Sequence, residues 1–251
     1  MRSMAPRTGC ATVPADVRRL AWDGTRPGAM CFDVARIAQP GPELFDPGHY
    51  GEHASTVQAG GRQAAWFVDG GFGHGVLRHY RRGGMVARLS RQRYVWLGEA
   101  RTRCFMEFQL LESLASQGLP VPAPLAAGYW RVGRLGYEAA ILVARLPDVR
   151  PLAALLDQPV WDVAADAIAR MHQAGVWHAD LNAYNILVDA RGKAWIIDFD
   201  RGRQGGVTRA GQRRNIERLR RSLEKVAGAA GLAFFQKLDH SYRERMARAP
   251  A

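Results

Sequence analysis

Hydrophobic residues follow one period in the first half of the chain and another in the second. From residue 56 to residue 146, short apolar runs between glycine-rich turns are typical of strands. These strands are predicted at about 56–59, 64–69, 75–80 and 137–146. One helix is predicted among them, ending at Gly118, because phenylalanine and leucine recur at helical spacing. The residues that carry this spacing are Phe105, Phe108, Leu111 and Leu114.

Beyond residue 146 the pattern becomes mostly helical. An apolar stripe predicts a helix over 159–175, and a second stripe through Ile216, Leu219 and Leu223 opens a pair of helices. Between them, two short apolar runs predict a hairpin. The fold class expected is α+β, in two lobes, with an antiparallel sheet and one helix in the first. The expected domains are an irregular segment 1–40, an N-lobe 41–146 and a C-lobe 147–251, with loop at 43–55.

Composition and charge narrow the class of partner. The chain has 251 residues, 47% of them hydrophobic, and a formal net charge of +12. Arginine supplies most of the positive charge, since only Lys193, Lys225 and Lys237 are lysines. A GC-rich genome would explain arginine in place of lysine, but not the excess of charge. The balance favours an anionic partner.

Other whole-chain features exclude several classes. Three widely spaced cysteines indicate neither a disulfide framework nor a metal motif. The first twenty residues lack the apolar core of a signal peptide, and no apolar run approaches the length of a membrane span.

The segment WHADLNAYNILVDARGKAWIIDFD, residues 177–200, concentrates carboxylates and amides beside two apolar runs. Folded as a symmetric hairpin about Arg191–Gly192, it would set Asn185 opposite Asp198, with Cβ atoms about 5 Å apart. An amide oxygen and a carboxylate at that separation suit Mg²⁺. Asp180 lies on the loop before the hairpin, where a carboxylate can accept a proton from a hydroxyl nucleophile.

Each of these residues taken alone fits an ordinary turn beside a strand. His178 is expected to anchor the backbone rather than to do chemistry. The combination of His-x-Asp-x₄-Asn with a hairpin and Asp-Phe-Asp nevertheless favours phosphoryl transfer.

The same segment resembles the catalytic and metal loops of protein-kinase-like enzymes, and more specifically those of bacterial lipopolysaccharide kinases. The strings LRHYRRGG (77–84), LPVP (119–122) and NIERLRRSLEK (215–225) are similar to the branch of 3-deoxy-D-manno-octulosonic acid (Kdo) kinases. The resemblance covers about residues 55–228.

The resemblance implies that Asp180 is the catalytic base and that Asn185 and Asp198 hold Mg²⁺. It implies ATP as the phosphoryl donor, with Arg78 in the position of the usual phosphate-binding lysine and Glu107 as its partner on the helix. The nucleotide-covering loop would lie at 58–65, with contacts from Gly60, Gly61 and Arg62. The more glycine-rich GGFGHG (70–75) is expected to be only a hairpin turn.

Departures from the kinase pattern indicate the acceptor. Ala179 replaces an arginine that senses activation-loop phosphorylation, Asp200 replaces a glycine, and no long peptide-docking segment follows. A small or lipid-linked hydroxyl is therefore favoured over a protein. The resemblance implies a Kdo-lipid A precursor as acceptor, with transfer to its 4-hydroxyl, on the anionic cytoplasmic face of the inner membrane. No nucleic-acid partner and no required protein partner are expected.

Two alternatives stay open from sequence. A heptose kinase of the lipopolysaccharide core, or another small-molecule kinase, would share the same loops. A non-catalytic basic binding module would explain the charge alone, although the retained Asp180, Asn185 and Asp198 argue against it. The basic stretch 212–221 fits a solvated helix face as well as an anionic surface.

Overall fold

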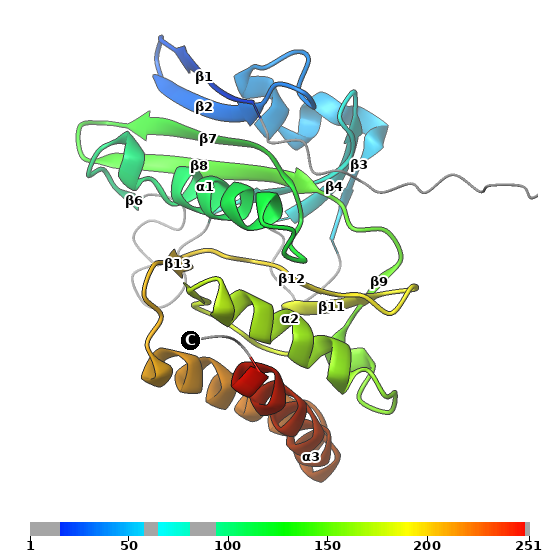
Figure 1. The fold of residues 1–251 in the computed structure, drawn as a ribbon. Coiled ribbons are helices and arrows are strands. Elements are labelled where there is room, and N and C mark those ends of the chain that lie inside the picture. The colour runs from blue at the N-terminus through cyan, green and yellow to red at the C-terminus, as the bar shows by residue number, and fades with distance from the viewer. Residues whose placement is uncertain (1–15, 58–64, 81–93, 249–251) are drawn as a thin grey trace, which may run out of the picture.

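Two lobes stand one above the other in the computed structural model, which describes residues 16–57, 65–80 and 94–248 (Figure 1). The upper lobe is built on an antiparallel sheet and carries one α-helix. The lower lobe is mostly helical and carries a short hairpin. This arrangement confirms the predicted α+β class.

The strands of the upper lobe pair in the order β1-β2-β7-β8-β5-β4-β3, and all neighbours are antiparallel. Their bounds are β1 Val17–Trp22, β2 Gly28–Asp33, β3 Ala54–Thr56, β4 Ala65–Gly70, β5 Gly73–His79, β7 Pro124–Val132 and β8 Gly136–Ala144, and the short β6, Tyr94–Val95, pairs with β8. GGFGHG forms the tight β4–β5 turn, as predicted, with Gly70 paired to Gly73.

The two faces of this sheet have different covers. Helix α1, Arg103–Ser116, packs on one face through Phe105, Phe108 and Leu111. Two 3-10 helices, Pro42–Phe45 and Pro47–His53, cover the other face with a separate apolar cluster. Side chains alternate along a strand, so consecutive residues of β5 serve opposite faces. This alternation turns Arg78 toward α1.

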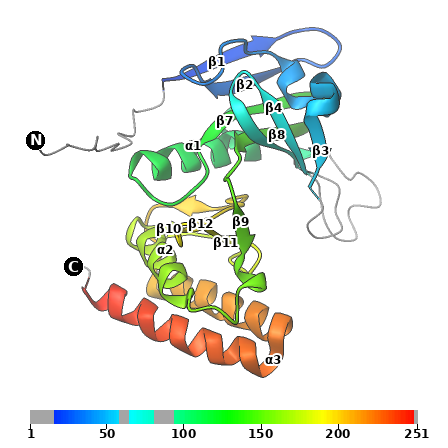
Figure 2. The same ribbon diagram turned by 90° about the vertical axis from the view of Figure 1, so that its right-hand side faces the viewer.

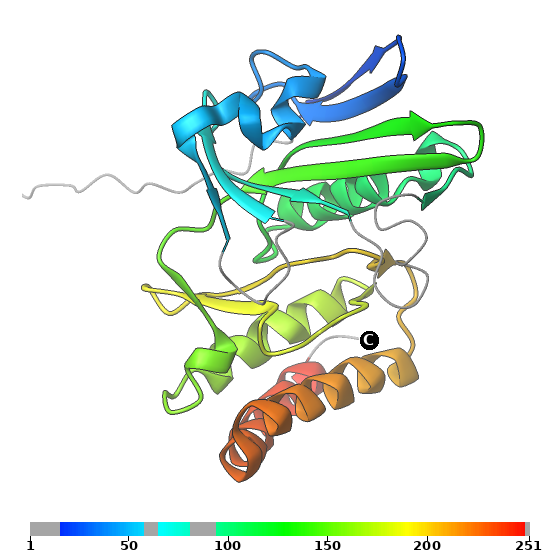
Figure 3. The same cartoon turned by 180° about the vertical axis from the view of Figure 1, so that it is seen from behind.

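In the lower lobe, α2, Trp161–Gln173, packs along α3, Arg209–Arg248 (Figure 2). Non-helical backbone at Ala227 and Gly228 divides α3 into two helices, which agrees with the predicted pair. The lower strands are β9 Val149–Pro151, β10 Val176–Trp177, β11 Ile186–Asp189, β12 Ala194–Ile196 and β13 Arg203–Gln204. The β11–β12 hairpin lies between the upper sheet and the helices (Figure 3). No helix in the described part of the chain is both long and apolar enough to span a bilayer.

The first forty residues differ from the irregular segment that was expected. Val17–Trp22 and Gly28–Asp33 form an antiparallel pair, and β2 continues the sheet along β7. Every residue of β2 is buried. The expected loop at 43–55 also contains helical turns. The domain boundary near residue 146 stays a prediction.

Candidate active site

Three charged side chains from separate elements meet where the two lobes face each other. Arg78 of β5 donates from Nη2 to both carboxylate oxygens of Glu107 on α1, at 2.6 Å each. The same guanidinium donates from Nη1 to Oδ1 of Asp198 at 2.5 Å. Arg78 and Glu107 were paired from sequence, and the structure brings them together with Asp198.

Burial gives this cluster its electrostatic character. The Glu107 side chain is only 3% exposed, and burial raises its pKa to about 6 against the opposing effect of Arg78. The hydroxyl of Tyr80 donates to Oε2 of Glu107 at 2.5 Å. Asp198 keeps 37% of its side chain exposed and Arg78 keeps 25%, so these two members of the cluster are open to a ligand.

The hairpin that carries Asp198 has a different register from the symmetric one predicted. Ile186 pairs with Ile196 and Val188 with Ala194, one residue away from the expected alignment. Asn185 consequently bonds to Ile197, through its carbonyl, and not to Asp198. Asp198 then takes a left-handed backbone conformation, with φ of 63°. Aspartate is among the few residues that adopt it readily.

The loop before the hairpin is held by its histidine. The backbone NH of Asp180 donates to Nδ1 of His178, and Nε2 of His178 contacts the Ile197 carbonyl, each at 3.0 Å. Since Nδ1 accepts, the proton lies on Nε2. Burial lowers the pKa of His178, which keeps the ring neutral. His178 therefore anchors the loop to the hairpin, as the sequence indicates.

Asn185 is oriented by the same loop. Its Nδ2 donates to the Asp180 carbonyl at 2.9 Å, while its NH donates to Oδ1 of Asn182. This assignment leaves Oδ1 of Asn185 as a hard oxygen donor. With the Asp198 carboxylate it fits Mg²⁺, which takes few protein oxygens and completes its shell with water and phosphate. Among the described residues, no group of three or more His, Cys, Asp or Glu could hold a metal ion.

Asp180 has a cationic partner that the sequence did not indicate. Arg218 of α3 donates to Oδ1 of Asp180 through Nε at 2.7 Å and also through Nη2. Partial burial raises the pKa of Asp180, but Asn182 and Arg218 outweigh this and lower it below its ordinary value. Asp180 is therefore ionised at neutral pH, with Oδ2 free of this pair.

A second ion pair joins α1 to the end of the hairpin. Arg103, at the start of α1, donates through Nε to Oδ1 of Asp200 at 2.7 Å and through Nη2 to Oδ2. The Arg103 guanidinium also lies 4.8 Å from the centre of the Tyr94 ring. The aspartate in place of the usual glycine thus has a structural partner. Neither arginine has a local sequence signal, because 97 residues separate one pair and 38 the other.

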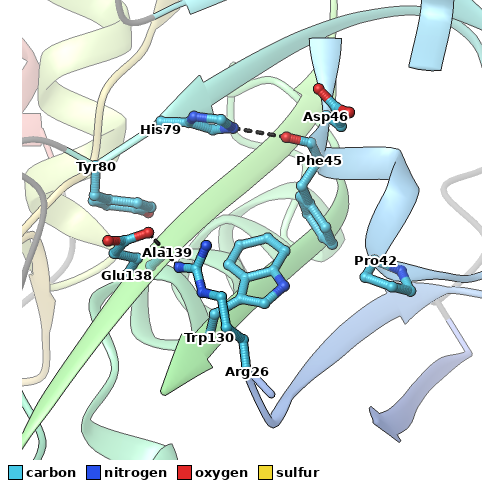
Figure 4. A pocket seen from close by; sticks show the side chains of 9 residues that line it. All are labelled: Arg26, Pro42, Phe45, Asp46, His79, Tyr80, Trp130, Glu138 and Ala139. Atoms are coloured by element: carbon cyan, nitrogen blue, oxygen red, sulfur yellow. Dashed lines mark hydrogen bonds and ion pairs between the residues drawn. The ribbon is translucent and has the colours of Figure 1, made fainter. Parts of the chain in front are cut away.

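Gly60, Gly61 and Arg62, predicted to cover the nucleotide, lie outside the described residues. A pocket of about 200 Å³ elsewhere in the upper lobe is not the same site (Figure 4). His79 and Glu138 line it, and strand alternation turns both away from the Arg78 face. Arg26 pairs with Glu138 across this pocket, and His79 contacts the Phe45 carbonyl.

Together the lobes, the arginine–carboxylate cluster and the loop with Asp180 define a phosphotransferase of protein-kinase-like fold. The chain belongs to the lipopolysaccharide kinase (Kdo/WaaP) family, whose model matches residues 50–242. It is therefore a kinase that transfers a phosphoryl group to a hydroxyl in lipopolysaccharide biosynthesis.

Relatives agree with this assignment. The chain is 52% identical to a 3-deoxy-D-manno-octulosonic acid kinase of Xanthomonas axonopodis pv. citri, over 82% of this chain and 84% of that protein. It is 47% identical to the enzyme of the same name from Xylella fastidiosa, over 90% and 91%. A solved structure, WaaP in complex with acyl carrier protein, matches with a TM-score of 0.53 and 16% identity, over 84% of this chain and 88% of that one. That structural likeness concerns the fold alone.

Proposed function

We propose that this kinase transfers the γ-phosphoryl group of ATP to a hydroxyl, the 4-hydroxyl, of a Kdo residue on a lipid A precursor. The observation that carries the proposal is the pairing of Arg78 with both Glu107 and Asp198, across the interlobe region from Asp180. Relatives named 3-deoxy-D-manno-octulosonic acid kinase, about half identical over most of their length, support this acceptor over a heptose.

In this mechanism Asp180 orients the acceptor. The acceptor oxygen attacks the γ-phosphorus, the bond to the leaving ADP oxygen breaks, and the hydroxyl proton passes to Asp180. A lowered pKa makes Asp180 a weak base, which suits a loose transition state in which the proton leaves late. Its main contribution is then orientation and charge at the nucleophile.

Arg78 holds the nucleotide phosphates in this proposal. Glu107 and Asp198 keep its guanidinium in place before nucleotide binds, and Gly60, Gly61 and Arg62 cover the phosphates. Asn185 and Asp198 would hold Mg²⁺, which neutralises charge on the β- and γ-phosphates when bound. The residues present fit this ion, since they offer one carboxylate and one amide oxygen.

The test is transfer of labelled phosphate from ATP, with Mg²⁺, to a Kdo-bearing lipid A precursor. The precursor without Kdo and a heptose-bearing acceptor serve as controls. We expect label only where Kdo is present, and NMR of the product should locate the phosphate on the 4-hydroxyl. Equal or faster labelling of the heptose acceptor would replace the Kdo assignment with the alternative.

The proposal includes a peripheral position on the cytoplasmic face of the inner membrane, where the acceptor is made. A chain with a net charge of +12 should be drawn to an anionic bilayer. We expect sedimentation with vesicles rich in phosphatidylglycerol and release at about 0.5 M salt, where the Debye length falls to a few ångströms. Retention at that salt concentration would indicate apolar anchoring instead.

A further inference from the structure

Four cations line one face of the first part of α3. Arg214, Arg218, Arg221 and Lys225 recur at helical spacing, and about 100° per residue places them within an arc of about 60°. All four are exposed. We call them the α3 cation row. At a rise of about 1.5 Å per residue the row is about 16 Å long.

The row lies beside the proposed catalytic residue, because one of its members, Arg218, contacts Asp180. Arg218 donates two hydrogen bonds to that carboxylate. One turn further along, the hydroxyl of Ser222 accepts the backbone NH of Ala183, so the helix is bonded to the loop at two levels. The position of the row relative to the acceptor hydroxyl is thereby set.

Acidic residues on the same helix make their hydrogen bonds outside the row, although Glu217 also attracts Arg221 electrostatically. Glu217 and Glu224 both pair with Arg220, which lies on another side of α3. Within the part of the chain that the structure describes, Arg214, Arg221 and Lys225 make no ion pair or hydrogen bond to another side chain. A solvated helix face usually carries both charges interspersed, whereas this one carries a single sign.

We propose that the α3 cation row binds the anionic groups of the acceptor that lie beyond the reacting sugar, namely phosphates of its glycolipid headgroup. This inference rests on the proposed function and names the part of the acceptor that the enzyme reads. The nucleotide is not the occupant, because Arg78 serves its phosphates from β5. Charge complementarity and a length suited to a disaccharide headgroup favour a phosphorylated glycolipid.

The decisive variant removes the three members of the row that do not touch Asp180: Arg214→Gln, Arg221→Gln and Lys225→Gln together. Its matched control removes three exposed arginines outside the row, Arg134→Gln, Arg191→Gln and, on another side of α3, Arg213→Gln; none of them has an ion pair within the described ranges. Both variants lower the net charge by three. Assays in neutral detergent micelles ensure that the acceptor supplies the only lipid phosphates.

For the row variant we expect the KM for the phosphorylated Kdo-lipid to rise at least tenfold, with the KM for ATP unchanged. Transfer to a small Kdo glycoside without phosphates should be unaffected, and the control variant should stay within threefold of wild type. Equal effects of the two variants, or an equal loss with the small glycoside, would overturn the proposal.

Binding separates failure of this inference from failure of the proposed function. Binding of the phosphorylated precursor without Kdo, measured in the same micelles, should weaken at least tenfold in the row variant. If wild type transfers no phosphate to Kdo but this weakening of binding occurs, the acceptor assignment is wrong and the proposed binding of phosphates by the row is supported. If wild type transfers phosphate to Kdo but the row variant binds the precursor as tightly as wild type, the binding role of the row is wrong and the acceptor assignment is not affected.

Discussion

Asp180 is ionised and paired with Arg218, so it brings a negative charge to the site as well as a weak base. We predict that Asp180→Asn lowers kcat by about 10²–10⁴, because it removes both the charge that orients the nucleophile and the proton acceptor. The KM for ATP should change little, since Arg78, Asn185 and Asp198 are untouched. The melting temperature should move only slightly, because the Arg218 pair is half exposed and such pairs contribute little. Steady-state kinetics and calorimetry measure both. Undiminished transfer would remove Asp180 from the mechanism.

Arg78 is expected to serve both stability and nucleotide binding. Arg78→Ala leaves Glu107 buried without its cation, which should cost about 3 kcal/mol in the free energy of unfolding. It should also raise the KM for ATP and lower kcat, and Arg78→Lys should recover part of both.

A double variant distinguishes the two roles of Arg78. Arg78→Met with Glu107→Gln removes the unpaired charge, so most of the lost stability should return while activity stays low. Urea unfolding and kinetics on the same preparations provide the measurement. Full activity in this double variant would show that another cation holds the phosphates.

At the scale of elements, α1 and the end of the β11–β12 hairpin are joined by Arg103 and Asp200. This pair keeps α1, which carries Glu107, in line with the segment that carries Asp198. We predict that Arg103→Gln and Asp200→Asn each lower kcat about tenfold, and that the double variant is no worse than either alone. The melting temperature of each variant should change only slightly, although its kcat falls. Additive losses would show that the two residues act separately.

Elements with a strong local pattern were predictable, and pairings that depend on a turn were not. Helix α2 and the first part of α3 follow from apolar stripes. The hairpin register slipped by one residue because a three-residue turn, Ala190 to Gly192, joins the strands, with Gly192 at φ of 77°. A symmetric two-residue turn had been assumed.

The β1–β2 pair has a sequence signal of its own. Asp23–Gly24 is a frequent hairpin dipeptide, and it lies between the runs VRRLAW and GAMCFD. At the site, sequence paired Arg78 with Glu107, but Arg218 and Arg103 could not be found. Contacts between such distant positions depend on how elements pack, which no local pattern reports.

At the scale of the whole molecule, the buried side chain of His172 makes the free energy of unfolding depend on pH. His172 of α2 contacts the Tyr242 hydroxyl at 2.8 Å and Oδ1 of Asn215 at 3.2 Å. Burial lowers the pKa of His172 to about 4. Between about pH 6.5 and 4 the unfolded chain therefore binds more protons than the folded one. The contribution of neutral His172 to the free energy of unfolding is fully present above about pH 6.5. It decreases as the pH falls through that window.

We predict that His172→Gln is less stable than wild type at pH 7.5, because it loses part of this network. The difference should narrow by about 2 kcal/mol by pH 5, since 1.36 kcal/mol corresponds to one pKa unit. Glu107, with its raised pKa, is present in both proteins, so its titration cancels. Chemical denaturation at both pH values measures the difference, and a constant gap would contradict the assignment.

The buried strand β2 has a consequence for how the protein can be shortened. The family model matches from residue 50, which leaves β1 and β2 outside that match, although the Xylella fastidiosa relative matches 90% of this chain. A recombinant fragment that begins at residue 50 would uncover the edge of β7 and lose five of the twelve buried residues of the apolar cluster beneath the two 3-10 helices. Bare edge strands pair with other chains, so this fragment should precipitate on expression. The boundaries of the family match are therefore not safe boundaries for expression, because the folded sheet extends upstream of residue 50.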